Sequence, residues 1–510
     1  MQQKIDSIPK DKRKKILLLS DDLRTLSGIA TMSKEIVLGL AHRYNWVQLG
    51  AMVKSPEQGK VYDMSAAINQ EIGDVDASVK LYPFSGYGNP DVLRELLSIE
   101  KPDAIVHFTD PRFWLWLYSI EREIRQYCPI IYYNIWDDLP YPMYNKPYYE
   151  SCDGLLAITK QTYNINKWVL GPELCKTIDK KIFDTTTGVI TDVIDEAPTK
   201  KILHYCPHGV NTAKYFPIED DSKLEEARKK LFGSKRYKYV IFYNSRNIRR
   251  KQTSSILLAF RTFCDNLSQE EANECVLVLH TNPVDENGTD LLSCKDALCP
   301  KYNVIFSADK IPAEILNEYY NIADVTIHLS DNEGFGIGTC ESLSAGTPII
   351  VNVTGGLQDQ CGFVDDAGNP IEFTRDWSTN NDGRYKTCGK WAKPVFPASR
   401  MIQGSIPTPY IFGDYGKWED AAQAMYDWYK VDRTERKSCG KAGREFILND
   451  GGLNSVNMCN QIALGIDATI ENWKGRERFN LIKVTPNYSL HSMPNSGADI
   501  GIKIPQLLKE

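Results

Sequence analysis

Short apolar runs alternate with amphipathic stretches along most of the chain. KILLLS (15–20) and DAIVHF (103–108) each contain a short continuous apolar run, which is typical of parallel strands buried on both faces. The stretch IATMSKEIVLGLAHRY (29–44) instead repeats its apolar residues every three to four positions, as a helix does, and NWVQLGAMV (45–53) follows as another apolar run. This strand–helix–strand order predicts a doubly wound parallel sheet.

A second alternation begins at YKYVIFYNS (237–245) and runs to PIIVNV (348–353). Two consecutive arrays predict an α/β chain of two Rossmann-like domains that face a central cleft. We expect a basic leader (1–14), an N-terminal Rossmann-like acceptor domain (15–218) and a charged linker region (219–236). A C-terminal Rossmann-like donor domain (237–414) follows, with an irregular insertion at about 361–413. The chain then continues in C-terminal helices (415–475), whose return to the N-terminal domain is left open, and in an extended tail (476–510).

Composition narrows the function classes. With 42% hydrophobic and 25% charged residues, the 510-residue chain is globular, and a net charge of −6 argues against a protein that coats nucleic acid through a global basic field. The 13 cysteines include no CxxC pair, which indicates reduced thiols rather than a zinc site or disulfide framework. No apolar stretch reaches the length of a membrane span. We therefore expect a cytoplasmic protein, with peripheral membrane contact left open.

The segment SDNEGFGIGTCESLSAGTP (330–348) carries the most chemistry. A strand feeds a glycine-rich loop that opens a helix, so unpaired N–H groups at the helix start suit a diphosphate. Glu333 and Glu341 bracket the loop, and carboxylates accept paired hydrogen bonds from sugar hydroxyls. The plainer interpretation is an ordinary loop with a glutamate near its helix.

A basic cluster, YNSRNIRRKQ (243–252), also follows a strand. Arginine and lysine at the carboxyl end of a strand in an open sheet are well placed to bind phosphate and to stabilise a departing diphosphate. The alternative is a solvated helix start, although basic residues are unfavourable there.

Together these segments resemble the retaining glycosyltransferases of family 4, which have the GT-B fold. Glu333 and Glu341 match the family's E-x7-E motif, and Arg246 and Lys251 match its arginine–lysine element. CPHGVNTAKYFP (206–217), SAGTPIIVNVTGGLQD (344–359) and the loop Ser27–Gly28–Ile29–Ala30 resemble further family motifs, over roughly residues 15–475 in all.

The resemblance implies specific roles. Arg246 and Lys251 would bind the diphosphate and stabilise its departure, and Glu333 would contact the donor sugar near the reacting centre. Glu341 would hold the ribose. The remaining donor-binding positions implied are Gly28, Gly334, Phe335 and Gly336.

The N-terminal domain departs from the family pattern. The family often has a His-x-His pair, and this chain has His107 but Thr109 in place of the second histidine, with Asp110 as a neighbouring candidate. His107 is alternatively a core residue. The aromatic segment YYNIWDDLPYPMYNKPYYE (132–150) suggests an acceptor surface, where Asp137 and Asp138 would orient a hydroxyl, or alternatively a packed loop.

We therefore expect transfer of a hexose or pentose from a nucleoside diphosphate sugar, with retention of configuration. No cofactor or metal is expected, since Arg and Lys would replace the metal's charge and the Asp74-Val75-Asp76 triplet is read as a chance match. The acceptor is a glycan, a lipid-linked glycan, a hydroxylated base in DNA or a small soluble molecule. The alternatives are a nucleotide-sugar epimerase of the same fold and an inactive sugar-binding homologue, and the oligomeric state is left open.

Overall fold

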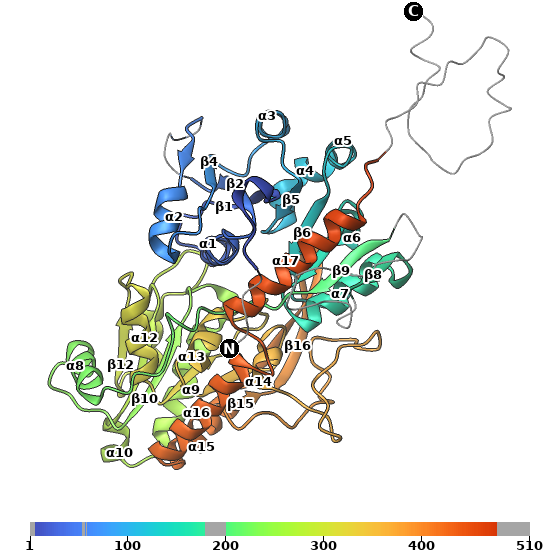
Figure 1. The fold of residues 1–510 in the computed structure, drawn as a ribbon. Helices are drawn as coiled ribbons and strands as arrows, with labels where there is room; N and C mark the ends of the chain where they lie inside the picture. Colours follow the sequence, from blue (N-terminus) through green and yellow to red (C-terminus); the bar gives the residue numbers. More distant parts are fainter. Residues whose placement is uncertain (1–5, 54–56, 58, 179–199, 477–510) are drawn as a thin grey trace, which may run out of the picture. The chain divides into compact units, whose positions relative to one another are not determined.

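The computed structural model describes residues 6–53, 57, 59–178 and 200–476. In this part of the chain the predicted alternation forms two separate parallel sheets, of nine and six strands (Figure 1). The predicted α/β architecture with two Rossmann-like sheets is therefore confirmed. The predicted tail, 476–510, lies outside the described residues except for Arg476.

The first sheet has the strand order β3-β4-β2-β1-β5-β6-β7-β9-β8, in which only β3 is antiparallel to its neighbour. Its central strand β1 is buried on both faces, with Ile16 to Leu19 fully inaccessible, which explains the continuous apolar run. The strands are β1 Lys15–Asp21, β2 Asn45–Ala51, β3 Tyr62–Asp63, β4 Val79–Pro83, β5 Ala104–His107, β6 Ile130–Asn134, β7 Gly154–Ala157, β8 Cys175–Thr177 and β9 Lys201–Tyr205. The helices and 3-10 turns of this half are η1 Lys10–Lys12, α1 Gly28–Leu40, α2 Ser65–Ile72, α3 Pro90–Glu100, η2 Pro111–Trp114, α4 Leu115–Ser119, α5 Glu121–Ile124, η3 Met143–Asn145, α6 Lys146–Glu150, α7 Lys160–Leu170 and η4 Pro172–Leu174. We call this part, through β9, the N-terminal half.

The second sheet has the order β12-β11-β10-β13-β14-β15 and is parallel throughout. Its strands are β10 Tyr239–Asn244, β11 Cys275–His280, β12 Val304–Ser307, β13 Val325–His328, β14 Ile349–Asn352 and β15 Ala392–Val395. The associated helices and turn are α8 Asp221–Phe232, η5 Arg249–Lys251, α9 Thr253–Asp265, α10 Gln269–Asn273, α11 Leu291–Leu298, α12 Ala313–Ile322, α13 Ile337–Ser344 and α14 Leu357–Cys361. We call the part from α8 to α16 the C-terminal half.

The region 361–413 is more regular than predicted. It contains β15, the sixth strand of the second sheet, and most of an antiparallel hairpin of β16 (Pro397–Ser405) and β17 (Thr408–Gly416). Most of β16 is exposed, so the alternation of buried and exposed positions that marks a strand is missing from its sequence.

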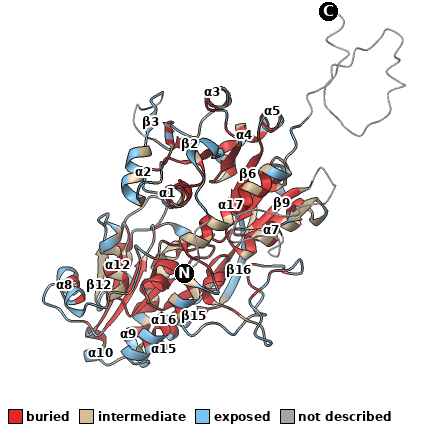
Figure 2. Cartoon of the chain, viewed as in Figure 1, coloured by how far each residue is buried: buried red, intermediate tan, exposed pale blue. Residues whose placement is uncertain are grey.

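The chain ends its described part in three helices, α15 (Trp418–Lys430), α16 (Arg433–Leu448) and α17 (Ser455–Asn472). The first packs on α9 and the second on α13, whereas α17 packs on α1, β7 and β9 of the N-terminal half (Figure 1, red helix). Gly39 lets α17 approach closely, because a Cβ there would lie 2.3 Å from the Sγ of Cys459. Figure 2 shows that the central strands of both sheets are buried, whereas the edge strands β3, β8 and β12 are not.

In each sheet the order in which successive strands are added reverses, at β1 in the first sheet and at β10 in the second. β1 lies between β2 and β5, and β10 lies between β11 and β13. Ligands of open parallel sheets bind outside the carboxyl ends of the strands at such a switch point. The segments that follow β1 and β10 contain Ser27–Gly28 and the basic cluster, so the topology places both beside a candidate site.

Candidate functional site

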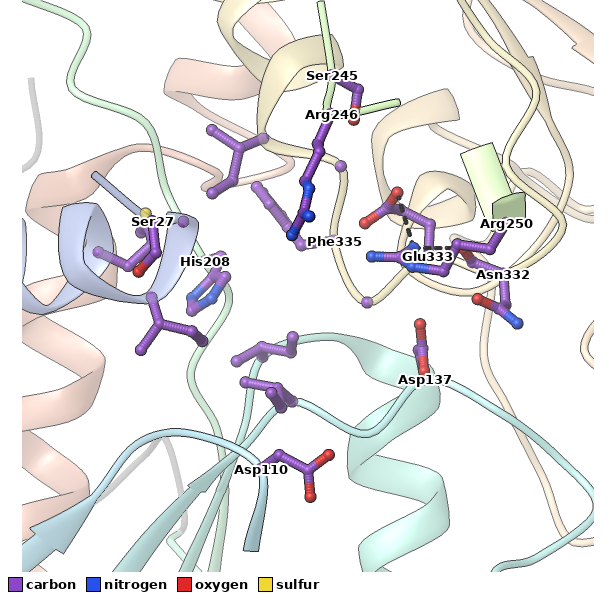
Figure 3. Close-up of a pocket in the computed structure, with 18 of the residues that line it drawn as sticks. Ser27, Asp110, Asp137, His208, Ser245, Arg246, Arg250, Asn332, Glu333 and Phe335 are labelled. Carbon is purple, nitrogen blue, oxygen red and sulfur yellow. Dashed lines mark hydrogen bonds and ion pairs between the residues drawn. The ribbon is translucent and has the colours of Figure 1, made fainter. Parts of the chain in front are cut away.

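A cavity of about 1130 Å³ is lined by residues from both halves of the chain (Figure 3). We call it the shared pocket. All the site residues predicted from the sequence except His107 line it, and they come from loops and helices that follow strands in both sheets. The sequence motifs, up to some 300 residues apart, are therefore brought to one place.

Glu333 is the most heavily bound side chain of the pocket, and it is bound through one oxygen. Its Oε2 accepts from Lys251, from Nη1 of Arg250 at 3.3 Å and from Oγ of Ser330 at 3.2 Å. Among the described residues no hydrogen bond reaches Oε1. One oxygen thus fixes the carboxylate and the other is left to accept from a ligand hydroxyl.

The charge state of this cluster follows from burial and neighbours. Burial by itself raises the pKa of Glu333, but the charges of Lys251 and Arg250 outweigh it and hold that pKa below its ordinary value. Burial lowers the pKa of Lys251, and the Glu333 carboxylate opposes that shift. The cluster is accordingly an ionised acid with two cations beside it.

Arg246 lines the pocket but does not contact Glu333. Its side chain is 63% exposed and its Nε donates to Asp285 at 2.9 Å. The arginine beside Glu333 is Arg250, which also donates from Nη1 to the carbonyl of Asn332 at 2.8 Å. The sequence placed Arg250 in the basic cluster without assigning it a role, because the spacing pattern selected only Arg246 and Lys251.

Two helix starts point their free N–H groups at the same cavity. Helix α13 begins after Gly336, which has a φ of 84°. This conformation favours glycine, and a Cβ at this position would lie 2.5 Å from the side chain of Leu357. Helix α1 begins at Gly28, and a Cβ there would lie 3.8 Å from Ile337, the first residue of α13. Helix N-termini favour anions, so the pair suits a phosphate group. Gly334 and Phe335 also line the pocket here.

Glu341, one turn into α13, is buried and faces tyrosines. The hydroxyl of Tyr320 donates to its Oε2 at 2.7 Å, and Nδ2 of Asn244 donates to that hydroxyl at 2.8 Å. Burial raises the pKa of Glu341 to about 7, against the lowering effect of hydrogen bonds from Tyr320 and Tyr215. Glu341 therefore titrates near neutral pH.

The N-terminal half contributes carboxylates. Asp137 lies across from the Glu333 loop, with its Oδ2 3.8 Å from where a Cβ of Gly334 would be, and burial raises its pKa. Asp138 is buried and its Oδ1 accepts from Nδ2 of Asn380 at 3.1 Å. Asp110 also lines the pocket, where it is paired with Arg112. Figure 3 shows Asp110 and Asp137 on the side opposite Arg246 and Arg250.

His107 does not reach the pocket, which corrects its assignment as a candidate site residue. It is fully buried, its Nδ1 lies 2.7 Å from the hydroxyl of Tyr118, and its ring stacks on Tyr132. Burial lowers its pKa to about 3, so it is neutral. It is a core histidine, the alternative that the sequence left open.

His208 lines the pocket and was not singled out from the sequence. Its Nδ1 lies 2.8 Å from the hydroxyl of Tyr133, its ring packs edge-on against Phe335, and burial lowers its pKa to about 3. No residue spacing marks this histidine, because its place depends on the packing of the two halves.

Residues 224–367 match the family model for glycosyl transferases group 1. The chain is 36% identical over 67 residues to D-inositol 3-phosphate glycosyltransferase of Thermomonospora curvata, or 12% of this chain and 16% of that protein. It is 27% identical over 177 residues to mannosylfructose-phosphate synthase of Agrobacterium fabrum, or 34% of this chain and 37% of that protein. These matches therefore span well under half of each relative's length.

Solved structures resemble the whole described fold. Sucrose-phosphate synthase of Thermosynechococcus elongatus superposes with a TM-score of 0.59 at 14% identity, covering 90% of this chain and 100% of that one. The Anabaena protein HepE, in complex with UDP and glucose, superposes with a TM-score of 0.58 at 12% identity, covering 89% of this chain and 100% of that one. The chain thus has the GT-B fold, and its residues 224–367 match the family of glycosyl transferases group 1.

Proposed function

We propose that the protein is a glycosyltransferase that moves a hexose or pentose from a nucleoside diphosphate sugar to an acceptor hydroxyl. One observation carries this proposal. Lys251 and Arg250 flank Glu333, two helix N-termini open onto the same cavity, and the free oxygen of Glu333 faces into it. A diphosphate needs the cations and N–H groups, and a sugar needs the carboxylate.

In this proposal the main catalytic contribution is stabilisation of the leaving diphosphate. Lys251, with Arg246 after a small side-chain movement, neutralises the charge that develops on the β-phosphate as the glycosidic bond breaks. Glu333 holds the donor sugar, and Glu341 accepts from the ribose hydroxyls. Asp137, on the opposite wall, orients the acceptor hydroxyl, whose proton passes to the departing phosphate oxygen.

We further propose retention of anomeric configuration and membership of family 4. The support is the E-x7-E spacing of Glu333 and Glu341 together with the five-residue step from Arg246 to Lys251. The anomeric proton coupling of the first-formed product, read by NMR, tests retention directly. An inverted product would remove this part of the proposal.

Metal independence is also a proposal. It is supported by the three cations of the C-terminal half that line the pocket, Arg246, Arg250 and Lys251. Transfer measured with and without a chelator should give the same rate. Loss of activity in chelator that Mg²⁺ or Mn²⁺ restores would show that the cations do not replace a metal.

The decisive experiment measures donor binding and nucleoside diphosphate release. UDP-, GDP- and ADP-sugars are screened by thermal shift, and the best donor is then assayed with a panel of hydroxyl acceptors. We expect one donor to bind and to release its nucleoside diphosphate, and Lys251→Ala to lower kcat about 100- to 1000-fold without unfolding the protein. Binding without release would favour the inactive homologue, and conversion of the donor sugar without release would favour the epimerase.

A further inference from the structure

We infer that the acceptor is an uncharged polyhydroxyl molecule rather than a phosphorylated sugar or polyol. This inference rests on the proposed function and names the substrate class of its acceptor side. It differs from what the names of several similar proteins describe, since these refer to phosphorylated compounds.

The charges of the shared pocket are divided between its two walls. Among the described residues, the lining cations are Arg112, Arg246, Arg250 and Lys251, and the last three belong to the C-terminal half, where the donor diphosphate would bind. Arg112 is the cation of the N-terminal wall. A phosphorylated acceptor would need a free cation on that wall.

Arg112 is not free. Its Nε lies 2.9 Å from both carboxylate oxygens of Asp110, and Nη2 makes a further bond to the same carboxylate. Its Nη1 donates to Oγ1 of Thr408 in the hairpin, and the guanidinium lies 5.8 Å from the ring of Trp136. The pair is partly buried, so the charge of Arg112 is neutralised in place.

The rest of this wall is acidic or neutral. Asp137 faces the cavity, and Arg250, the cation nearest to it, is already engaged with Glu333 and the carbonyl of Asn332. A phosphate dianion placed here would face carboxylates without a partner, and like charges repel strongly in a partly buried site. The same argument disfavours the backbone phosphates of DNA.

The N-terminal wall of the shared pocket does suit the ring of a sugar or cyclitol, which has apolar C–H faces and polar hydroxyls. The partly buried Trp136 lines it from the N-terminal half, and Gln403 and Ser405 of the β16–β17 hairpin line the pocket with uncharged polar groups. The C–H faces of a sugar or cyclitol pack on aromatic rings while its hydroxyls bond to carboxylate, amide and hydroxyl groups. This combination recognises an uncharged polyol.

The test compares matched acceptors that differ only by a phosphate. With the donor found by the binding screen, kcat/KM is measured for myo-inositol and inositol 1-phosphate, fructose and fructose 6-phosphate, and glucose and glucose 6-phosphate. We expect the uncharged member of at least one pair to be used and preferred at least about 10-fold over its phosphorylated partner. Preference for the phosphorylated member in any pair that is used overturns the inference.

A variant tests whether the neutralisation of Arg112 by Asp110 is what disfavours phosphorylated acceptors. Asp110→Asn removes the charge that neutralises Arg112 but keeps a side chain of the same size, so the ratio of phosphorylated to uncharged acceptor use should rise at least about 5-fold. Asp103→Asn, on the surface beside Lys14, is the matched control and should leave the ratio unchanged. An unchanged ratio in a folded, donor-binding Asp110→Asn protein contradicts the inference.

Failure of the inference is separable from failure of the proposed function. Donor hydrolysis in the absence of acceptor and donor-induced thermal shift report on the donor side alone. If neither donor hydrolysis nor a donor-induced thermal shift is found for any donor, the glycosyltransferase proposal is wrong, and so is the inference that rests on it. If both are present and the phosphorylated acceptors are preferred, only the inference is wrong.

Discussion

At the scale of single residues, the asymmetric binding of Glu333 makes Arg250 a positioning residue. Arg250 donates to the Oε2 of Glu333 and to the adjacent carbonyl of Asn332. Arg250 thus keeps the free oxygen of Glu333 aimed into the pocket. This role is independent of any direct contact with the donor.

We predict that Arg250→Ala raises the donor KM about 10-fold, because a charged hydrogen bond that orients Glu333 is lost. Arg249→Ala is the matched control, since Arg249 is the preceding residue and is exposed. Steady-state kinetics of both variants check the prediction. Equal KM values for the two variants would remove Arg250 from donor recognition.

In the proposed function, Glu341 makes donor binding depend on pH. Its pKa of about 7 means that the carboxylate is protonated below that pH and ionised above it. Ribose hydroxyls donate to the ionised form, so donor affinity should fall below pH 7, by up to about 10-fold per unit, and level off above it. Calorimetric titration with the nucleoside diphosphate sugar, whose esterified phosphates do not titrate in this range, measures the effect, and Glu341→Gln should abolish the acidic decline.

At the scale of elements, the region between α14 and α15 connects the two halves beside the pocket. Asn380 is fully buried and bonds to both. Its Oδ1 accepts from the backbone N–H of Leu139 at 2.7 Å and from Gln161 at 3.0 Å, while its carbonyl accepts from Gln358 at 2.8 Å. The hairpin adds a backbone bond from Phe412 to the carbonyl of Leu139.

We predict that Asn380→Ala lowers the free energy of unfolding by about 2 kcal/mol, because buried partners are left without hydrogen bonds. Asn369→Ala, in an exposed turn of the same region, should change it by less than about 0.5 kcal/mol. Denaturant unfolding of both variants measures the difference. A neutral Asn380→Ala would show that this junction does not hold the halves together.

At the scale of the described molecule, residues far apart in sequence stabilise one another through α17. Asp467 of α17 accepts from Nη2 of Arg43 at 2.5 Å and from the hydroxyl of Tyr44 at 2.7 Å, at the end of the segment that follows α1. The N-terminal half is therefore completed by residues from the end of the described chain. Within this part of the chain no helix is long and apolar enough to cross a bilayer.

Asp467→Asn should lower the free energy of unfolding by about 2 kcal/mol, since the buried Arg43 loses its counter-charge. Asp450→Asn, at an exposed position between α16 and α17, is the control and should be nearly neutral. Thermal unfolding followed by circular dichroism compares the two. Matching transition temperatures would mean that the Asp467 contacts contribute nothing net.

The sequence by itself determined the two parallel sheets and much of the wall that the C-terminal half contributes to the pocket. Burial on both faces forces continuous apolar runs, so β1 and β10 are legible from residues 15–20 and 237–245. The spacing of Glu333 and Glu341 is likewise local, because one loop and the helix that follows it hold both residues.

Only the tertiary structure decided how side chains from separate segments pair. It placed Arg250 beside Glu333, buried His107 against Tyr118, and brought Thr408 of the β16–β17 hairpin into contact with Arg112. These outcomes depend on contacts between residues roughly 80 to 300 positions apart, except for the local burial of His107. Such contacts leave no periodicity in the chain, because each is set by the packing of whole elements rather than by neighbouring residues.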